Sequence, residues 1–418
     1  KYFVTGSVEF GEEDSGTESS PVVYRSYPGE DARIIGGKEV SGFMPVRDTK
    51  VLSVLPAESK GKVLVCDLKK EGINDFGKML NRGSGGGDFP SAMELFYNGS
   101  LMQVSRWPND GWLFVHDLLT PGGDGGSGEE TFQKGRFRYT GDRPARWKEE
   151  NDLWTVGYFN WPWDKFHLQV TGIDTVNRII NLAPNINYAK SYPLYYAPVR
   201  RDKPHYFYNI LSEIDMPGEF YVDRKEGLLY FYPPKEIGKD DEIMVSILET
   251  PVLKVVNASN MVFYGLTLEC TRLDAIKISE GRNNLVAGCR IRNIGRSGVT
   301  IDGGFRHCVT GSDISDIGGA GIRLSGGNWK KLIPSRHLVE NNYICRFNRL
   351  GGGPGVSVMG IGNRVSHNLI TDTPHQAIVF DYNNHVIEYN EIYDVVSEAK
   401  DAGVIYIYGA QKSFVSRG

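Results

Sequence analysis

The chain has 418 residues, enough for roughly two to three ordinary domains or for one stack of repeats, since a single compact core stops growing well below this length. Hydrophobic residues make up 40% and charged residues 23% of the chain, which excludes a disordered protein, and the apolar runs are too short to span a membrane. With 47 Lys and Arg against 51 Asp and Glu, the formal net charge is −4 and no basic tract could follow a phosphate backbone, so we expect no nucleic-acid partner.

The first 93 residues contain short strands separated by glycine and polar turns. Apolar alternation recurs in residues 21–25 (PVVYR), 32–37 (ARIIGG) and 40–43 (VSGF). These segments suit one or two coils of the repeat that fills the second half of the chain, so we predict N-terminal β-helix coils over residues 1–93. Because Lys1 is not an initiator residue, we expect a processed or partial chain.

Residues 94–240 differ from both flanks, because long aromatic strands and turns replace the short apolar segments. Residues 221–234 (YVDRKEGLLYFYPP) are typical of a β-hairpin, and we predict a β-rich inserted domain. Six of the seven tryptophans lie in it: Trp107, Trp112, Trp147, Trp154, Trp161 and Trp163. Trp161 and Trp163 flank a proline and are candidates for stacking on a sugar ring, but large rings also fill the core of a small β-domain. Both interpretations stay open.

Residues 241–418 contain an internal repeat. Six segments share the order small residue, apolar, variable, apolar, and their first apolar members are separated by 22 to 34 residues. These members are Ile276, Val299, Ile322, Val356, Ile378 and Val404. A second ladder comprises Val286, Val309, Val339, Val365, Ile387 and Val415, and a third comprises Ile291, Ile314, Ile344, Ile370 and Ile392.

Three short alternating strands per repeat indicate a parallel β-helix, in which each coil buries alternate side chains against the coils above and below. We therefore predict an all-β fold, a right-handed parallel β-helix (solenoid) over residues 241–418 with the β-rich insertion before it. Asn342, Asn368 and Asn390 recur at one coil position and predict a structural ladder of amides with left-handed turn geometry. The longest coil carries extra residues at 326–336 and 349–353, which we expect to wall a binding face.

Strand alternation also predicts which side chains point outward. The outward column contains Lys277, Thr300, Arg323, Ser357, Val379 and Ile405, and the column beside it contains Ser279, Asp302, Ser325, Met359 and Asp381. Arg323 and Asp381 are thus candidate substrate-binding residues. Asp302 and Asp381 lie three coils apart, roughly 14 Å at ~4.8 Å per coil, too far for a catalytic carboxylate pair.

Three positions before the buried ladder, successive coils carry His375 and Asp401, which should therefore be neighbours. An acid beside a histidine on an open face can transfer protons, because each group tunes the pKa of the other. The alternative is an ordinary surface ion pair. Glu398, on the same connecting loop as Asp401, is a further candidate acid.

The five cysteines form no CxxC pair and have no histidine at metal-ligand spacing. We interpret them as small buried apolar residues and expect neither a metal site nor a cofactor. They are Cys66, Cys270, Cys289, Cys308 and Cys345.

Several motifs along the chain, in order, resemble the secreted bacterial right-handed β-helix proteins grouped around glycoside hydrolase family 141, which includes α-L-fucosidase and xylanase activities. They are residues 14–17 (DSGT), 27–30 (YPGE), 35–37 (IGG), 105–109 (SRWPN), 217–223 (PGEFYVD), 230–234 (YFYPP), 387–392 (IEYNEI) and 401–406 (DAGVIY). The resemblance implies a secreted or periplasmic enzyme that acts on a carbohydrate.

The resemblance also implies one catalytic carboxylate, the Asp of a DxGxIY motif, which falls on Asp401. The family's second acid belongs to a later Tyr-Leu-Asp-Asp-Gly motif, which does not occur in the 418 residues. Val404 stands where the family has Ala. We expect Asp401 to be one carboxylate of a glycoside hydrolase active on a plant or host polysaccharide or oligosaccharide, aided by His375.

Two other functions are consistent with the same residues. A polysaccharide lyase would use outward cations to neutralise a uronate and abstract a proton, and Lys277 and Arg323 occupy such positions. A non-catalytic glycan-binding β-helix module would need no acid pair. The sequence does not determine the oligomeric state.

Overall fold

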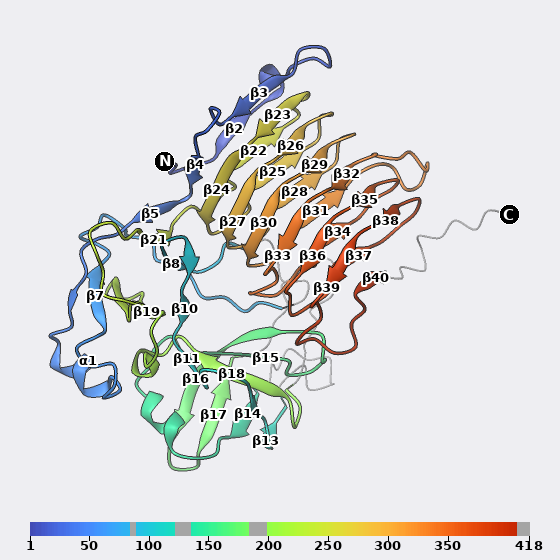
Figure 1. The fold of residues 1–418 in the computed structure, drawn as a ribbon. Coiled ribbons are helices and arrows are strands. Elements are labelled where there is room, and N and C mark those ends of the chain that lie inside the picture. Colours follow the sequence, from blue (N-terminus) through green and yellow to red (C-terminus); the bar gives the residue numbers. More distant parts are fainter. Residues whose placement is uncertain (84–88, 122–134, 184–198, 408–418) are drawn as a thin grey trace. The chain divides into compact units, whose positions relative to one another are not determined.

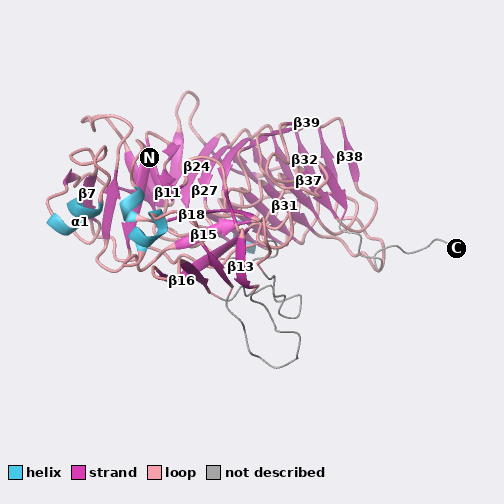
Figure 2. Ribbon diagram, turned by 90° about the horizontal axis from the view of Figure 1, so that it is seen from below, coloured by secondary structure: helices cyan, strands magenta, loops and turns pink. Residues whose placement is uncertain are grey.

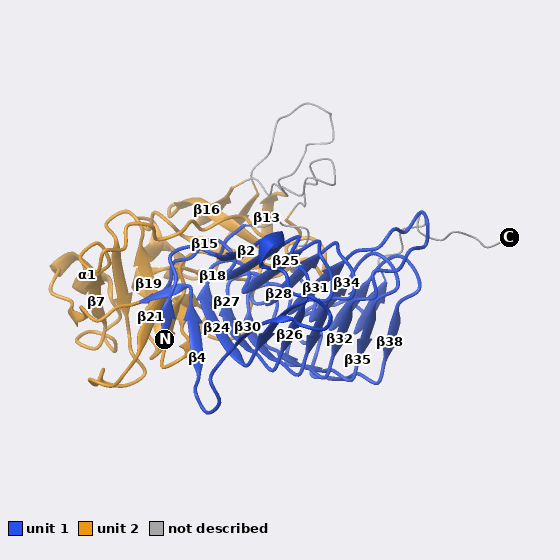
Figure 3. Cartoon of the chain, turned by 90° about the horizontal axis from the view of Figure 1, so that it is seen from above, with its two compact units in different colours: residues 1–38, 89–91, 246–418 blue, residues 39–88, 92–245 orange. Residues whose placement is uncertain are grey.

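The computed structural model describes residues 1–83, 89–121, 135–183 and 199–407, and strands dominate these residues (Figures 1 and 2). The chain divides into two compact units (Figure 3). The β-helix unit comprises residues 1–38, 89–91 and 246–418, and the inserted unit comprises residues 39–88 and 92–245.

Three parallel sheets build the β-helix unit, and each coil contributes one strand to each sheet. Sheet I comprises, in spatial order, β1 (Tyr2–Phe3), β4 (Ala32–Ile35), β24 (Leu266–Thr271), β27 (Arg290–Ile294), β30 (Asp313–Ile317), β33 (Tyr343–Cys345), β36 (Leu369–Thr371) and β39 (Glu391–Tyr393). Sheet II comprises β2 (Val8–Phe10), β22 (Leu253–Val256), β25 (Ile276–Ser279), β28 (Val299–Asp302), β31 (Ile322–Ser325), β34 (Val356–Val358), β37 (Ile378–Phe380) and β40 (Ile405–Ile407). Sheet III comprises β3 (Val22–Arg25), β23 (Met261–Tyr264), β26 (Leu285–Ala287), β29 (Cys308–Thr310), β32 (Leu338–Glu340), β35 (Arg364–Ser366) and β38 (Val386–Glu388). The predicted parallel β-helix is confirmed.

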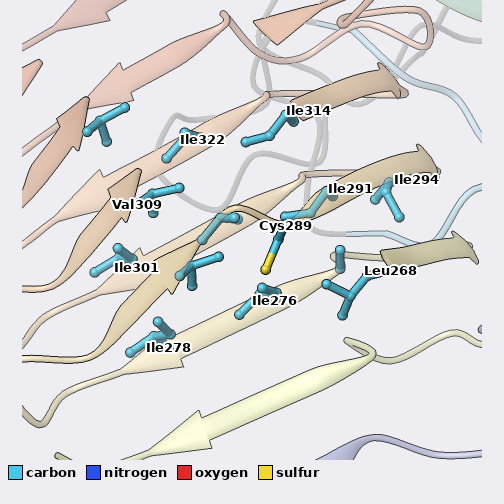
Figure 4. Packing of buried hydrophobic residues seen from close by; sticks show 14 of the residues in the cluster. Leu268, Ile276, Ile278, Cys289, Ile291, Ile294, Ile301, Val309, Ile314 and Ile322 are labelled. Atoms are coloured by element: carbon cyan, nitrogen blue, oxygen red, sulfur yellow. The ribbon is translucent and has the colours of Figure 1, made fainter. Parts of the chain in front are cut away.

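The apolar ladders account for this stacking. Ile276, Val299, Ile322, Val356 and Ile378 pair in register along sheet II, and all five are fully buried. The second ladder holds from Val286 to Ile387, and the third holds from Ile291 to Ile392. Figure 4 shows members of all three ladders gathered in the core of the unit, where Cys289 fills the space beside them. Burial of these side chains, worth roughly 1.5–3 kcal/mol each, is the main stabilising term of the stack.

The last position of the first ladder was predicted wrongly. Ile378 pairs with Ile405, and Phe380 pairs with Ile407. Val404 instead precedes the strand, and its carbonyl accepts the backbone N–H groups of Ala377 and Ile378. Val415, predicted for the second ladder, lies outside the described residues.

The predicted asparagine ladder is present, with one difference in backbone geometry. The side-chain oxygen of Asn368 accepts the Asn342 backbone N–H at 3.1 Å, and that of Asn390 accepts the Asn368 backbone N–H at 3.1 Å. The left-handed φ angles belong to the preceding residues, His367 at 57° and Tyr389 at 54°. Each turn therefore places its αL residue first and uses the following amide to satisfy backbone groups of the neighbouring coil.

A second side-chain ladder lines the turns between sheets II and III. His307 Nδ1 accepts the Asn284 backbone N–H at 3.2 Å, and His337 Nδ1 accepts that of His307 at 3.2 Å. Asn363 and His385 continue the pattern on the next coils. The His307 and His337 rings stack with centroids 5.1 Å apart. Histidine and asparagine are interchangeable here because each offers one acceptor to the coil above.

The N-terminal strands join the β-helix only as far as residue 38. β3 pairs with β23, and β4 lies between β1 and β24. Residues 39–88, predicted as part of the coils, instead belong to the inserted unit, where β7 (Leu64–Asp67) pairs with β6 (Met44–Pro45) and β20 (Leu228–Phe231). Pairing with β20 thus assigns to the inserted unit a segment that the alternation of apolar residues in the first 43 positions had placed in the coils.

In its described residues, the inserted unit contains three mixed or antiparallel sheets. The first comprises β10 (Gln103–Val104), β19 (Glu219–Asp223), β20, β7 and β6; its β19–β20 pair is the predicted hairpin. The second comprises β11 (Arg106–Trp107), β18 (Pro204–Tyr208), β15 (Trp154–Gly157), β16 (Phe166–Asp174), β17 (Ile179–Leu182), β14 (Arg136–Arg138) and β13 (Asp117–Thr120), with β12 (Leu113–Phe114) also on β18. The third contains β21 (Ile243–Ser246), β8 (Leu95–Tyr97) and β9 (Ser100–Leu101), together with β5 (Gly37–Glu39), in which the chain passes from the β-helix unit into the inserted unit. Its helical segments are α1 (Thr49–Val54) and the short 3₁₀ turns η2 (Arg143–Trp147) and η3 (Leu211–Glu213); η1 (Glu12–Asp14) belongs to the β-helix unit.

Candidate active site on the β-helix

Two loops that carry predicted site residues are hydrogen-bonded to each other. The loop after β39 donates from the Val396 backbone N–H to the His375 carbonyl at 3.0 Å and from the Glu398 backbone N–H to the Pro374 carbonyl at 3.3 Å. Ser397 Oγ donates to the Thr373 carbonyl at 3.1 Å. His375 and Glu398 therefore lie on adjoining turns of successive coils, at the entry to sheet II.

Asp401 follows on the same loop. Its side chain is exposed, and its backbone adopts a left-handed φ of 58°, a conformation that Asp and Asn tolerate better than most residues. Because Ile405 pairs with Ile378, the coil position equivalent to His375 is Ala402. Asp401 thus lies one residue before the column in which it was predicted.

The column predicted to point outward on sheet II pairs in the predicted register through Lys277, Thr300, Arg323, Ser357 and Val379. Its first three members are half-buried, but Ser357 and Val379 are buried, so the prediction that the whole column faces solvent or substrate was wrong for these two residues. The column then continues to Tyr406, not to Ile405, because of the corrected register. Arg323 is held in place: its Nε donates to Ser297 Oγ at 3.1 Å, and its Nη2 donates to the Gly352 carbonyl at 2.7 Å. The second of these contacts ties Arg323 to the insertion at 349–353.

Asp381 directly follows β37, at the exit from sheet II, whereas His375 lies at the entry. Asp381 Oδ1 accepts the Tyr382 backbone N–H at 2.8 Å, and the Asp381 backbone carbonyl lies 2.9 Å from His385 Nε2. The Tyr382 ring packs against Trp329, with centroids 5.9 Å apart. Trp329 belongs to the insertion at 326–336, so this insertion places an aromatic surface beside Asp381.

Trp329 was not predicted as a site residue, because only the six tryptophans of the inserted domain were considered as sugar-stacking candidates. The signal was present, because Trp329 lies in the longest coil, where extra residues predict a wall of the binding face. The Trp329 side chain is half-exposed, and the Lys330 ammonium lies 5.5 Å from its ring centroid. An aromatic face next to a carboxylate suits a sugar ring, whose C–H groups pack on the ring while its hydroxyls reach the acid.

A buried polar network lies beneath the outward column and was also missed. Asp274, with no exposed surface, accepts from Arg296 Nη1 at 2.9 and 3.1 Å, from the Ser297 backbone N–H at 3.1 Å and from Thr300 Oγ1 at 2.9 Å. Ser297 also receives the hydrogen bond from Arg323. The network therefore couples the position of Arg323 to a buried ion pair one coil away.

The two tryptophans predicted to bind substrate lie in the inserted unit. Trp161 is 38% exposed, and the Arg200 guanidinium lies 5.4 Å from its ring centroid. Trp163 is half-buried. Trp147 is fully buried, by contrast, and Trp107 packs against it at 5.5 Å. The tryptophans thus divide between core packing and partly exposed positions.

Within the described residues, no group of three or more His, Cys, Asp or Glu side chains has the arrangement of a metal site. No helix there is long and apolar enough to cross a membrane. All five cysteines lie in the described part of the chain and none of them forms a disulfide; all except the half-buried Cys308 are buried.

Neither protein-family models nor curated protein sequences match this chain. Two solved structures are similar to it. One is described as a glycoside hydrolase; it has a TM-score of 0.69 and 15% sequence identity, and the match covers 97% of this chain and 76% of the other. The second, described as the complex structure of XylC with xylose, has a TM-score of 0.46 and 10% identity over 94% of this chain and 56% of the other. At 15% sequence identity, the match to the first of these structures shows a shared fold and nothing more.

Proposed function

We propose that the protein is a glycoside hydrolase that acts on a plant or host polysaccharide or oligosaccharide at the outer face of sheet II. The observation that carries the proposal is the concentration of acids on the last described coils. Glu398 and Asp401 share the loop that is hydrogen-bonded to the His375 turn, and Asp381 lies beside the Trp329–Tyr382 surface. The likeness of nearly the whole fold to a glycoside hydrolase supports this choice of reaction.

Glycoside hydrolysis needs two carboxyl groups with different tasks. One protonates the leaving oxygen, and the other activates water or attacks the sugar carbon, at separations of about 5–5.5 Å for retention or about 6.5–9.5 Å for inversion. We assign Asp401 as one of them. Glu398, three residues earlier, is the nearest acid along the loop, and His375 would orient or charge-balance the pair.

The substrate would lie along sheet II. Arg323, fixed by Ser297 and the Gly352 carbonyl, presents a cationic donor toward sugar hydroxyls, while Trp329 and Tyr382 provide a surface on which a ring can stack. Asp381 would accept a hydrogen bond from a hydroxyl of the stacked sugar. In this arrangement the insertions of the long coil serve as the walls of the site.

The test is Asp401→Asn in the protein as it stands, assayed on a panel of aryl glycosides. Asn tolerates the left-handed backbone as well as Asp does, and the exposed acid contributes little to stability. We therefore expect most of the activity to be lost, with a thermal midpoint within about one or two degrees of the wild type.

Asp302→Asn serves as the matched control, because this exposed acid also lies on sheet II and accepts a hydrogen bond from Ser325. Near wild-type turnover by Asp401→Asn would remove Asp401 from the catalytic pair. Release of an unsaturated uronate, detected by its ultraviolet absorbance, would instead identify a lyase. Binding of glycans without turnover would identify a non-catalytic module.

A further inference from the structure

The turns between sheets II and III carry a row of cationic side chains that the proposed hydrolysis does not use. Arg282, Arg306 and Arg336 lie on three successive coils of the β-helix unit, and all three are exposed. Backbone contacts fix their order, because Arg282 forms a parallel bridge with Phe305 and the Arg306 N–H donates to the Ser335 carbonyl at 2.8 Å. Neighbouring turns are therefore about one strand spacing apart, ~4.8 Å.

The longest coil adds two lysines to this row. Asn328 and Ile333 exchange two backbone hydrogen bonds, at 2.8 and 3.0 Å, and so close a tight hairpin. Lys330 and Lys331 occupy its tip, and both are exposed. The hairpin lies between β31 and β32, on the same turn as Arg336 (Figure 1). We call the three arginines and the two lysines the basic edge.

The protein does not neutralise the basic edge. None of its five side chains forms an ion pair with a described residue. The acids that begin two of these turns have other partners: Glu280 accepts the Gly304 backbone N–H at 3.1 Å, and Asp302 accepts the Ser325 hydroxyl at 2.8 Å. Like charges at the spacing of one coil repel one another, and an anion bound along the row would relieve that repulsion.

The turns themselves do not require arginine. Arg306 and Arg336 adopt left-handed φ angles of 54° and 58°. The strand register makes them equivalent to Asn283, Gly362 and Asn384 on other coils, and all three of these also have positive φ angles. Asparagine and glycine adopt this conformation more readily than arginine does. The two arginines therefore add charge where the backbone favours a smaller, neutral residue.

The charge and the neighbouring side chains favour an anionic polysaccharide as the partner. Arginine holds a carboxylate or a sulfate group with two parallel hydrogen bonds. Phe305 and Ile333, which are 47% and 45% exposed, add apolar surface that can pack on the faces of sugar rings. A row one turn wide suits a single linear chain. The net charge of −4 disfavours duplex nucleic acid and anionic membranes, which would bring a wide negative surface against the rest of the protein.

We propose that the basic edge binds a linear anionic polysaccharide that carries carboxylate or sulfate groups along its length. The arginines contact anionic groups of successive sugars, and Phe305 contacts a ring between them. The proposal goes beyond hydrolysis at sheet II and stands whether or not the protein cleaves a glycosidic bond. Trp329 belongs to the same hairpin as the two lysines, so a polysaccharide held here passes beside the Trp329–Tyr382 surface.

Isothermal titration of the full chain with polygalacturonate, which carries carboxylates, and with heparin, which also carries sulfates, tests the proposal. Neutral dextran, a single-stranded oligonucleotide and phosphatidylserine vesicles are the comparisons, and Asp401→Asn is titrated in parallel so that cleavage cannot mask binding. We expect saturable binding of at least one anionic polysaccharide and none of dextran. Raising the salt concentration from ~0.05 M to ~0.5 M should weaken this binding, because salt screens exposed charges.

The double variant Arg306→Asn/Arg336→Asn should weaken the binding by roughly 5- to 30-fold, since each exposed ion pair contributes up to about a fivefold factor. Its thermal midpoint should not fall, because asparagine suits the left-handed turns and no ion pair with the described residues is lost.

Lys148→Asn/Lys225→Asn is the matched control. It removes the same charge from exposed turns of the inserted unit and should keep wild-type affinity. The proposal is overturned if neither anionic polysaccharide binds, if the oligonucleotide or the vesicles bind more tightly than both polysaccharides, or if the two double variants weaken binding equally.

Discussion

Asp274 shows how a single residue can determine the stability of a solenoid face without contacting solvent. Its carboxylate receives hydrogen bonds from Arg296, Thr300 and the Ser297 backbone. A buried pair of this kind contributes little in net terms, because desolvation offsets most of the attraction, but removal of one partner leaves an uncompensated charge. Removing one charge of the Asp274–Arg296 pair should therefore destabilise the fold more than replacing both residues by apolar ones.

We predict that Asp274→Ala lowers the free energy of unfolding by about 3–5 kcal/mol, as measured by urea denaturation. Asp302→Ala, which removes an exposed carboxylate at the end of β28, should change the free energy of unfolding by less than about 0.5 kcal/mol. The double variant Asp274→Ala/Arg296→Met should recover most of the loss, since no buried charge then remains. A double variant as unstable as the single one would show that packing, not charge, dominates at this position.

Single residues also mark the limit of the sequence reasoning. Which loops carry His375 and Glu398 follows from strand spacing alone. The contact of Trp329 with Tyr382 does not, because it depends on how an 11-residue insertion reaches the turn two coils along, and no periodicity describes an insertion.

At the scale of the element, the register of β40 explains a specific error of prediction. Residues 403–407 (GVIYI) contain two sets of alternating apolar residues, Val404 with Tyr406 and Ile405 with Ile407. A slip of one residue exchanges the two faces of a strand. Each earlier coil has one apolar set and one polar or mixed set, so its register was predictable. In residues 403–407 both sets are apolar. The hydrogen bonds that Ala377 and Ile378 donate to the Val404 carbonyl place Ile405 opposite Ile378.

The histidine ladder makes an element-scale prediction about acid. Burial lowers the pKa of His307 to about 3 and that of His337 to about 4, below the value near 6.5 expected in the unfolded chain. Between these values the unfolded state binds more protons than the folded state, so stability is complete above about pH 6.5 and declines as the pH falls. Each buried ring should cost on the order of 2 kcal/mol at pH 5.

His307→Asn should therefore lose about 2 kcal/mol less stability than the wild type between pH 7 and pH 5, as measured by urea denaturation at both values. Asn is a fitting replacement because Asn284 and Asn363 already occupy the same ladder. His367→Asn is the control: this ring is exposed, and Asn tolerates its left-handed φ of 57°. If the wild type, His307→Asn and His367→Asn lose the same stability between pH 7 and pH 5, the groups that take up protons on unfolding lie outside the histidine ladder.

At the scale of the whole molecule, the β-helix unit is assembled from two parts of the chain. β4 lies within sheet I between β1 and β24, whereas β3 is the outermost described strand of sheet III. Arg33 on β4 pairs with Glu269 on β24 at 2.5 Å, and Arg292 pairs with the other Glu269 oxygen at 2.8 Å. The N-terminal strands are therefore part of the stack and not an appended arm.

Hydrogen exchange can verify this assembly. Amides of β4 should exchange about as slowly as those of β27, because both strands have a neighbour on each side, and more slowly than those of β3. Rates for β4 that match those of exposed loops would mean that residues 1–38 dock only transiently.

The Arg33–Glu269 pair joins residues 236 positions apart in the sequence, and this separation matters on the ribosome. At roughly 5–20 residues per second, some 10 to 50 seconds pass between synthesis of β4 and synthesis of the strand it pairs with. During that time the inserted unit can fold, but β4 can pair only with β1, and the edge that will meet β24 is open to other chains. We therefore expect residues 1–38 to be the segment most prone to aggregation until the coils have been synthesised.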